Sequence, residues 1–178
     1  MIFLTSDIHF GHKNVIGFCN RPFRDVDHMN EKLIKNWNEV IGIDDVVYII
    51  GDISFTGIEK TKEILRRLNG KKHVIKGNHD KKEHLEILKK EYLILNYQDY
   101  LELEHNGKLF ILFHYPIEEW HWMQKGTIHL HGHIHSGPTK SDYHSITKKE
   151  NRYDVGVDNN NYYPISIEDI IKKLGNKT

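Results

Sequence analysis

The chain lacks the features that mark disulfide scaffolds and membrane proteins. A single cysteine, Cys19, stands among 178 residues, so no internal disulfide can form and a reducing compartment suits the protein. We expect its thiol to be buried or unreactive rather than nucleophilic. The N-terminal apolar run, residues 1–4, follows no basic segment and is too short for a signal peptide or a membrane span. The sequence therefore predicts a cytoplasmic protein that does not enter a membrane.

An excess of either charge is also missing. Lys and Arg together number 25, as do Asp and Glu, so the formal net charge is zero. No long-range field attracts polyanions, and any attraction for a phosphate group has to be local. The balance of charge and the lack of a basic stripe leave a nucleic-acid partner possible but not favoured.

Linkers and repeats are absent as well. No stretch rich in Pro, Gly or Ser divides the chain, and 38% apolar with 28% charged residues is ordinary for a globular protein. A length of 178 residues suffices for one domain and is short for two. We therefore expect a single domain over residues 1–178. The sequence leaves its oligomeric state open.

The first half of the chain alternates between strand and helix patterns. Apolar, β-branched runs predict strands at residues 2–6, 46–50 and 73–76. Helical spacing predicts helices over residues 25–40, after the capping-box sequence Thr56-Gly57-Ile58-Glu59, and over 81–90. This order predicts parallel strands with helices packed on the faces of the sheet.

The second half of the chain is mostly strand-like. Residues 97–104 and 108–113 flank Asn106-Gly107, a strong signal for a tight hairpin. Further strands are expected at residues 127–130 and 152–157, before a final helix capped by Ser166. We predict an α/β fold in which two mixed sheets pack face to face with helices outside. Two irregular stretches, 10–24 and 136–151, are long enough to be functional.

Histidine is present in excess, with 14 residues in 178. Many of these histidines belong to five short polar clusters, each of which directly follows a strand-like run. The clusters are Asp7-Ile8-His9, Gly51-Asp52, Gly77-Asn78-His79-Asp80, His114 and His131-Gly132-His133-Ile134-His135. Since the ligand crevice of an open α/β sheet lies at the carboxyl ends of its strands, the five clusters can converge in space.

Taken singly, several clusters have a plain structural explanation. Asp-x-His pairs such as Asp7 and His9 arise often by chance, and Asp52 on its own would suit a helix or turn cap. Gly77-Asn78 is typical of a turn, but a turn explains neither His79 nor Asp80. In an extended chain, however, the spacing of Asp7 and His9 places both side chains on one side, as a metal chelate requires.

The strongest local signal is the alternating histidine trio that ends at His135. Three imidazoles at alternate positions after a strand would be costly to bury unpaired, and imidazole is the commonest metal-ligating side chain. Nitrogen and oxygen donors without thiolates favour a catalytic over a structural metal site. Two divalent ions about 3.5–4 Å apart can clamp the oxygens of a phosphoryl group and ionise water near neutral pH. Because no Ser or Cys nucleophile motif and no P-loop motif is present, a metal-bound hydroxide is the simplest nucleophile.

As an ordered set, the motifs Asp-x-His, Gly-Asp, Gly-Asn-His-Asp, His and Gly-His-x-His resemble the calcineurin-like metallophosphoesterase family. The resemblance is to its small, cap-less bacterial and phage-type members. It runs from Asp7 to His135, with a family-like strand at Val155-Gly156-Val157-Asp158. It implies a four-layer α/β sandwich and a dinuclear centre of two divalent metal ions, with Mn, Fe, Zn or Ni as the common choices.

The resemblance also implies a role for each residue of the clusters. The ligands of one ion would be Asp7, His9 and His135, and those of the other would be Asn78, His114 and His133. Asp52 would bridge the two ions. His79 would be the general acid, and Asp80 would orient it.

One segment departs from the family pattern. The Ser/Thr phosphatase branch continues Gly-Asp into a segment with a phosphate-gripping Arg, whereas here Ile53-Ser54-Phe55-Thr56-Gly57 follows Asp52. This departure argues against protein phosphatase activity. Candidates for a replacement grip are His12 and Arg21, although a loop salt bridge explains Arg21 equally well. Trp120 and Trp122 would either wall the metal site or anchor a packed loop.

The function that follows is metal-dependent hydrolysis of phosphoester bonds, with a small phosphate ester or a nucleotide as the substrate. The absence of a cap domain favours phosphodiesters, which an open groove admits. The alternatives are a phosphomonoesterase or nucleotide phosphatase, and a non-catalytic metal-binding scaffold for protein interaction. A scaffold would be expected to have lost a ligand or the acid histidine, and none is missing here.

Overall fold

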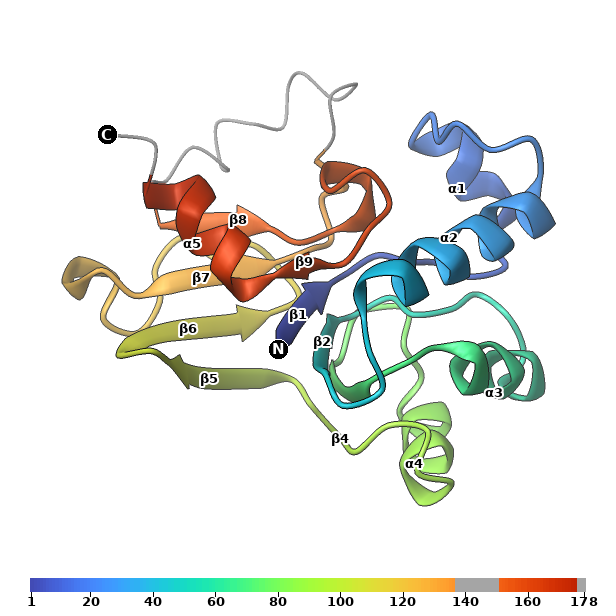
Figure 1. The fold of residues 1–178 in the computed structure, drawn as a ribbon, viewed down its shortest axis with the longest axis horizontal. Helices are drawn as coiled ribbons and strands as arrows, with labels where there is room; N and C mark the ends of the chain where they lie inside the picture. Colours follow the sequence, from blue (N-terminus) through green and yellow to red (C-terminus); the bar gives the residue numbers. More distant parts are fainter. Residues whose placement is uncertain (137–150, 176–178) are drawn as a thin grey trace.

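Two mixed β-sheets packed face to face form the centre of the molecule (Figure 1). The computed structural model describes residues 1–136 and 151–175. In the first sheet the strand order is β4 (Asn96–Gln98), β3 (Lys71–Ile75), β2 (Val46–Ile50), β1 (Ile2–Thr5) and β9 (Ile165–Ser166). Strands β1 to β4 are parallel, and β9 runs antiparallel to β1. The predicted parallel half of the fold is confirmed.

The second sheet contains β5 (Tyr100–His105), β6 (Lys108–Phe113), β7 (Ile128–His131) and β8 (Arg152–Asp154). The hairpin between β5 and β6 turns at Asn106 and Gly107, whose φ angles of 51° and 73° match the predicted tight turn. Strands β6, β7 and β8 are parallel. The strand predicted over residues 97–104 is in fact divided, because Tyr97 pairs with β3 in the first sheet and Tyr100 begins β5 in the second.

Within residues 1–136 and 151–175, five α-helices accompany the sheets: α1 (Lys13–Phe18), α2 (Val26–Val40), α3 (Ile58–Arg67), α4 (Lys82–Lys90) and α5 (Ile167–Gly175). The same residues include the short 3-10 helices η1 (Met123–Lys125) and η3 (Val157–Asn159). The α1 helix lies within the stretch expected to be irregular, 10–24. Most of the other stretch, 136–151, falls outside the described residues.

Side-chain caps begin α2 and α5, and the second of these caps was predicted from the sequence. Asp25 caps α2 by accepting a 2.8 Å hydrogen bond from the backbone N–H of His28. Ser166 caps α5 by accepting from the backbone N–H of Asp169 at 3.1 Å. The capping box predicted at Thr56 is wrong, because α3 starts from Gly57 with no side-chain cap. The Thr56 hydroxyl instead hydrogen-bonds the hydroxyl of Thr61.

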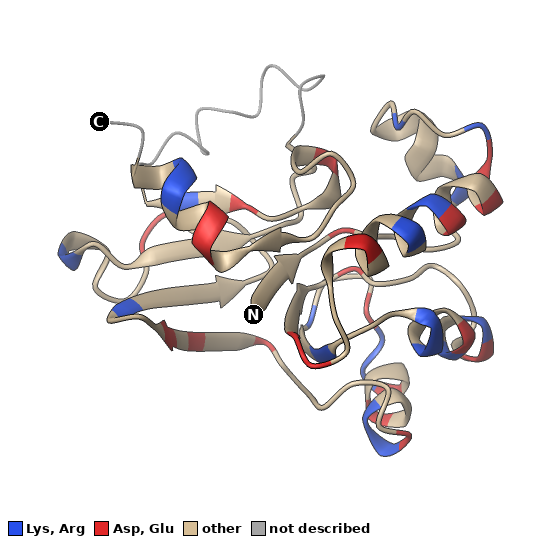
Figure 2. Ribbon diagram, viewed as in Figure 1, with Lys and Arg blue, Asp and Glu red and all other residues tan. Residues whose placement is uncertain are grey.

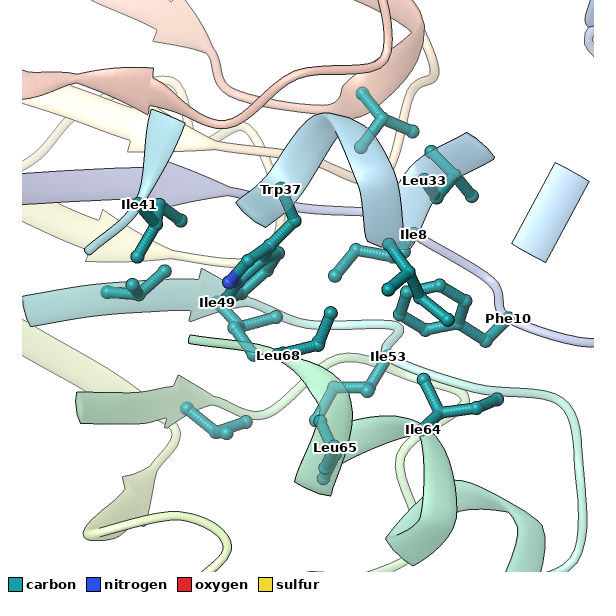
Figure 3. Close-up of a cluster of buried hydrophobic side chains, with 14 of the residues drawn as sticks. Ile8, Phe10, Leu33, Trp37, Ile41, Ile49, Ile53, Ile64, Leu65 and Leu68 are labelled. Carbon is teal, nitrogen blue, oxygen red and sulfur yellow. The ribbon is translucent and has the colours of Figure 1, made fainter. Parts of the chain in front are cut away.

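The hydrophobic core has two layers. One lies between the first sheet and helices α2 and α3, where Trp37, Ile49 and Leu65 are all buried (Figure 3). The other lies between the two sheets and includes Leu4 and Leu130. Period-2 alternation along the strands explains both layers, because successive side chains of β2 enter opposite faces of the sheet.

Charged side chains of both signs are interleaved over α2, α3 and α4 (Figure 2). Ion pairs join neighbouring helices, as between Arg67 and Glu31 at 2.6 Å and between Lys62 and Glu91 at 2.8 Å. Among the described residues, no helix combines the length and the apolar character that crossing a membrane requires.

The layered core yields a stability test at Ile49, which is fully buried between β2 and the helices. Ile49→Ala is expected to lower the free energy of unfolding by about 2–5 kcal/mol, because it leaves a cavity in a packed layer. Ile43 is 79% exposed, and Ile43→Ala should change that free energy by no more than about 0.5 kcal/mol. Urea unfolding of the two variants measures the difference, and equal effects would contradict this description of the core.

Candidate metal centre

The carboxyl ends of strands from both sheets meet at one edge of the molecule. The backbone N–H of Asp7, after β1, donates to Gly51 after β2 at 3.0 Å, and the N–H of Gly132, after β7, donates to His114 after β6 at 3.0 Å. A bridge between Ser6 and Gly156 joins the two sheets here. All five polar clusters predicted from the sequence therefore lie together.

The backbone is left-handed at five of the seven predicted metal ligands. Asp7, His9, Asp52, His133 and His135 have φ angles of 54°, 54°, 57°, 71° and 47°. Positive φ is uncommon for residues other than glycine, and each such residue costs of the order of 1–3 kcal/mol. Unfavourable backbone geometry gathered in one place is typical of functional sites, where the surrounding structure holds the side chains in position.

Two glycines allow the loops to approach so closely. Gly51 has φ of 84°, and a Cβ there would lie 2.6 Å from the Cα of Gly77. A Cβ on Gly132 would collide with the side chains of Ser6 and Asp7. Glycine in the Gly-Asp and His-Gly-His motifs is therefore a steric requirement of the site.

One cluster of donor atoms is formed by Asp7, His9 and His135, which lie within 4.8 Å of one another. The two Nε2 atoms of His9 and His135 are 3.3 Å apart, and Asp7 Oδ1 is 3.6 Å from that of His135. Asp7 Oδ2 accepts from Ser6 Oγ at 2.6 Å and from the backbone N–H of His133 at 2.9 Å. Asp7 Oδ1 is buried without a hydrogen-bond partner, so it is free to bind a cation.

A second cluster is formed by Asn78, His114 and His133. Asn78 Oδ1 lies 2.9 Å from His114 Nε2 and 3.1 Å from His133 Nδ1. Asp52 lies between the two clusters, with its Oδ2 3.6 Å from His9 Nε2 and 3.6 Å from His114 Nε2. This is the position that a carboxylate shared between two ions requires.

The outer nitrogens of two histidines are held by other groups, which directs the inner nitrogens to the centre. His114 Nδ1 lies 2.8 Å from the carbonyl oxygen of Ile50, and His135 Nδ1 lies 2.7 Å from Asp158 Oδ2. Such partners set the ring orientation and the basicity of metal-binding histidines. Each arrangement leaves Nε2 free for a metal ion.

The electrostatics of the first cluster favour a positive charge. Burial would lower the pKa of His135, but hydrogen bonds with Asp158 and Cys19 and the charge of Asp7 raise it to about 10. Burial, followed by the neighbouring charge of His135, lowers the pKa of His9 to about 2, so His9 is neutral, whereas His135 would have to release its proton to bind a metal ion. Burial also raises the pKa of Asp7. The donor atoms present thus fit divalent metal ions, which would compensate the buried carboxylates.

His79 and Asp80 differ in their surroundings. The imidazole of His79 is half-exposed, with Nε2 4.0 Å from Asp52 Oδ2, and its backbone N–H donates to Asp52 Oδ1 at 2.9 Å. The buried carboxylate of Asp80 accepts from the backbone N–H groups of Asp52, Gly77 and Ile53. The carboxylate oxygens of Asp80 thus hold the loops after β2 and β3 together, and its role in orienting the imidazole of His79 stays a prediction.

Arg21 is not available to grip a phosphate. Its guanidinium is buried and donates to Asp158 at 2.8 and 2.9 Å, to the carbonyl oxygens of Ile8 and Asp7, and to the sulfur of Met29. These contacts occupy all five N–H groups of the side chain. The structure thus shows the salt bridge that was the alternative explanation of Arg21, and its partner Asp158 also contacts the predicted ligand His135.

Asp158 is the residue of the site whose importance sequence reasoning missed. It lies in η3 and contacts both Arg21 and His135. Burial on its own would raise the pKa of Asp158. Its hydrogen bond with His135 and the charge of Arg21 outweigh burial and lower that pKa to about 2. Its position at the end of the apolar segment Val155-Gly156-Val157 was the available signal, because the other acidic clusters follow such runs too.

The remaining candidates are His12, which lies beside the proposed metal centre, and two tryptophans, which do not. The ring of His12 lies 5.5 Å from that of His9, so His12 borders the centre, and burial, followed by the charges of His79 and Arg21, lowers its pKa. Trp120 is buried against His129, and Trp122 borders a hollow beside Gly107, at the opposite end of β6 from His114. The two tryptophans therefore do not wall the metal centre, and the loop-anchor explanation holds for Trp120.

Proteins similar to this chain occur in archaea, bacteria and phages. An uncharacterised protein of Methanocaldococcus jannaschii is 38% identical over 97% of this chain and 90% of its own length. The gene 66 protein of Mycobacterium phage D29 is 31% identical over 76% of this chain and 78% of its own length. The crystal structure of a protein of unknown function from Aquifex aeolicus matches with a TM-score of 0.76 and 26% identity, covering 97% of this chain and 98% of that one.

The family model for calcineurin-like phosphoesterases matches residues 1–165, which include every strand end described above. Convergence of the Asp-x-His, Gly-Asp, Gly-Asn-His-Asp, His and Gly-His-x-His motifs at one edge agrees with that match. The chain belongs to the calcineurin-like phosphoesterase family.

Proposed function

We propose that this protein is a metal-dependent phosphoesterase that hydrolyses phosphodiesters in preference to monoesters. The observation that carries the proposal is the pair of donor clusters on either side of Asp52. Asp7, His9 and His135 would bind one divalent ion, Asn78, His114 and His133 would bind the other, and Asp52 would bridge them. Two divalent ions held there would neutralise charge on the phosphoryl oxygens and activate a water molecule as the nucleophile. The donor set suits Mn, Fe, Zn or Ni.

His79 is positioned to act as the general acid. In the hydrolysis, the oxygen of water forms a new bond to phosphorus while the bond between phosphorus and the leaving oxygen breaks. The leaving oxygen then needs a proton, which the half-exposed imidazole of His79 can supply beside Asp52. The hydrogen bond from the His79 backbone N–H to Asp52 Oδ1 holds this imidazole next to the shared carboxylate.

The contacts already made by the Arg21 guanidinium favour phosphodiesters over phosphomonoesters as substrates. A phosphodiester carries one negative charge, whereas a monoester near neutral pH carries close to two. Arg21, the candidate for an additional charge grip, is committed to Asp158 and to backbone carbonyls. His12 remains a proposed substrate contact, and its lowered pKa leaves it neutral rather than cationic. A phosphomonoesterase or nucleotide phosphatase is the second candidate, because the metal ligands would serve both reactions.

Turnover measurements test the proposed reaction. With Mn²⁺ added, bis-p-nitrophenyl phosphate is expected to be hydrolysed faster than p-nitrophenyl phosphate, and EDTA should abolish both activities until metal is restored. A faster monoesterase reaction would favour the second candidate. If bound metal is found by elemental analysis but neither substrate turns over, the protein is a metal-binding scaffold and the proposal is wrong.

Removal of the proposed acid should depend on the leaving group. His79→Ala is expected to lower kcat by about 10²–10⁴-fold for an alkyl leaving group, which needs a proton, and far less for p-nitrophenolate. Metal content should stay at the wild-type value, because His79 is outside both donor clusters. An equal loss of kcat for good and poor leaving groups would refute the role of His79.

The contact between Asp158 and His135 predicts an effect on metal binding. Asp158→Asn should weaken binding of the ion held by His135 by about 10–100-fold, as removal of such supporting carboxylates does.

Asp52→Asn should weaken the binding of both ions together, since this carboxylate would be shared. Asp44→Asn, at a carboxylate that is 95% exposed, is the matched control and should leave metal content unchanged. Elemental analysis after dialysis measures all three, and loss of a single ion in Asp52→Asn would disprove the bridge.

A further inference from the structure

An exposed phenylalanine borders the proposed metal centre at the point where the Ser/Thr phosphatase branch has its phosphate-gripping segment. Phe55 is three residues past Asp52, and its side chain is 43% exposed. Its ring centroid lies 4.7 Å from that of His79 and 5.7 Å from that of His9. An aromatic side chain thus lies beside the proposed metal centre, in the segment that carries a phosphate-binding arginine in the Ser/Thr phosphatase branch.

Another ring packs against one face of Phe55. The imidazole of His12 stacks on it with a centroid distance of 4.0 Å and an interplanar angle of 24°. Phe18, at the end of α1, meets His12 edge-on at 6.4 Å and is itself 72% exposed. These three rings form a shelf of aromatic side chains beside the centre, which we call the Phe55 shelf.

The loop that carries Phe55 is held in place by hydrogen bonds. The backbone N–H of Phe55 donates to the carbonyl oxygen of Phe10 at 2.8 Å. The hydroxyls of Ser54, Thr56 and Thr61 lie 2.9 to 3.0 Å from one another. A ring fixed in this way loses little conformational freedom when a ligand stacks on it, which favours binding.

The position of the shelf indicates which part of a substrate would meet it. Phe55 contacts His79, so the shelf lies on the side where the leaving oxygen would take up its proton. Another exposed ring, Tyr115, lies on the opposite cluster, with its centroid 4.6 Å from that of His133 and 5.1 Å from that of His114. The two rings therefore flank different ends of a phosphodiester bound across Asp52.

We propose that the Phe55 shelf binds a planar aromatic ring in the leaving group of the substrate. Phe55 is then a specificity-determining residue, and the protein selects esters with an aryl or nucleobase ring on the leaving side over aliphatic esters of similar size. This inference rests on the proposed function, because it needs the phosphoryl group to bind at the metal centre. Aromatic stacking tolerates different rings, since every base or aryl group presents a π-face.

Binding of two inert phosphonates to the Mn²⁺-loaded protein tests the inference without turnover. In a buffer alkaline enough to make both of them dianions, phenylphosphonate and cyclohexylphosphonate carry the same charge and similar bulk, but only the first has a planar ring. We expect calorimetry to show phenylphosphonate binding about tenfold more tightly to the wild-type protein, in line with stacking on one aromatic side chain. Phe55→Leu should abolish the preference, and Phe55→Tyr should keep it.

Tyr115→Leu is the matched control, because it removes an exposed ring from the other side of the centre and should leave the preference intact. Equal binding of the two phosphonates by the wild-type protein would overturn the inference, as would loss of the preference in Tyr115→Leu but not in Phe55→Leu. If neither phosphonate binds while Mn²⁺ is retained, the inference fails, and turnover of bis-p-nitrophenyl phosphate decides separately whether the proposed function stands. Adenosine monophosphate against ribose 5-phosphate, on the same variants, distinguishes a nucleobase from an aryl ring as the group bound.

Discussion

The carboxylate of Asp7 joins the two sheets at the edge where all the chemistry lies. Its Oδ2 accepts hydrogen bonds from Ser6 in the first sheet and from the backbone of His133 in the second. Only glycine at position 132 leaves room for this contact, because a Cβ there would overlap the side chains of Ser6 and Asp7. The convergence of loops from β1, β2, β3, β6 and β7 depends on this junction. Without it, the donor atoms of the two sheets would not face one another.

Buried charge is arranged in layers behind that junction. Asp7 and Asp52 lie at the centre, His135 links Asp7 to Asp158, and Arg21 contacts Asp158 in turn. Asp80 performs a similar task for the loops after β2 and β3 by accepting three backbone N–H groups. Buried carboxylates are costly unless they are paired or hydrogen-bonded, and here each has a defined partner or faces the centre. The same contacts hold the left-handed backbone of the proposed ligands, which local sequence preferences would not maintain.

Sequence patterns predicted much of the fold and of the site. Alternation and β-branched runs located the strands, Asn106-Gly107 located the hairpin, and polar residues after each strand located the proposed ligands. The failures have a common cause. Thr56 and Arg21 are polar residues with several plausible partners, and which partner each takes depends on loops that approach from elsewhere in the chain. Asp158 was missed for the same reason, since its contacts with Arg21 and His135 span 137 and 23 residues of sequence.

The amino-acid sequence by itself predicted the α/β class, most of the strands and the candidate donor residues, because periodicity and residue chemistry are local properties. The ordered motifs also sufficed to identify the family, which the match over residues 1–165 confirms. Only the tertiary structure showed that these candidate donors lie in two groups on either side of Asp52, and that Arg21 is buried against Asp158 instead of facing the site. It also decided that Phe55 stands beside His79, where the sequence showed only the lack of an expected arginine. Distances between side chains on different loops depend on how the sheets pack, and no local pattern encodes that packing.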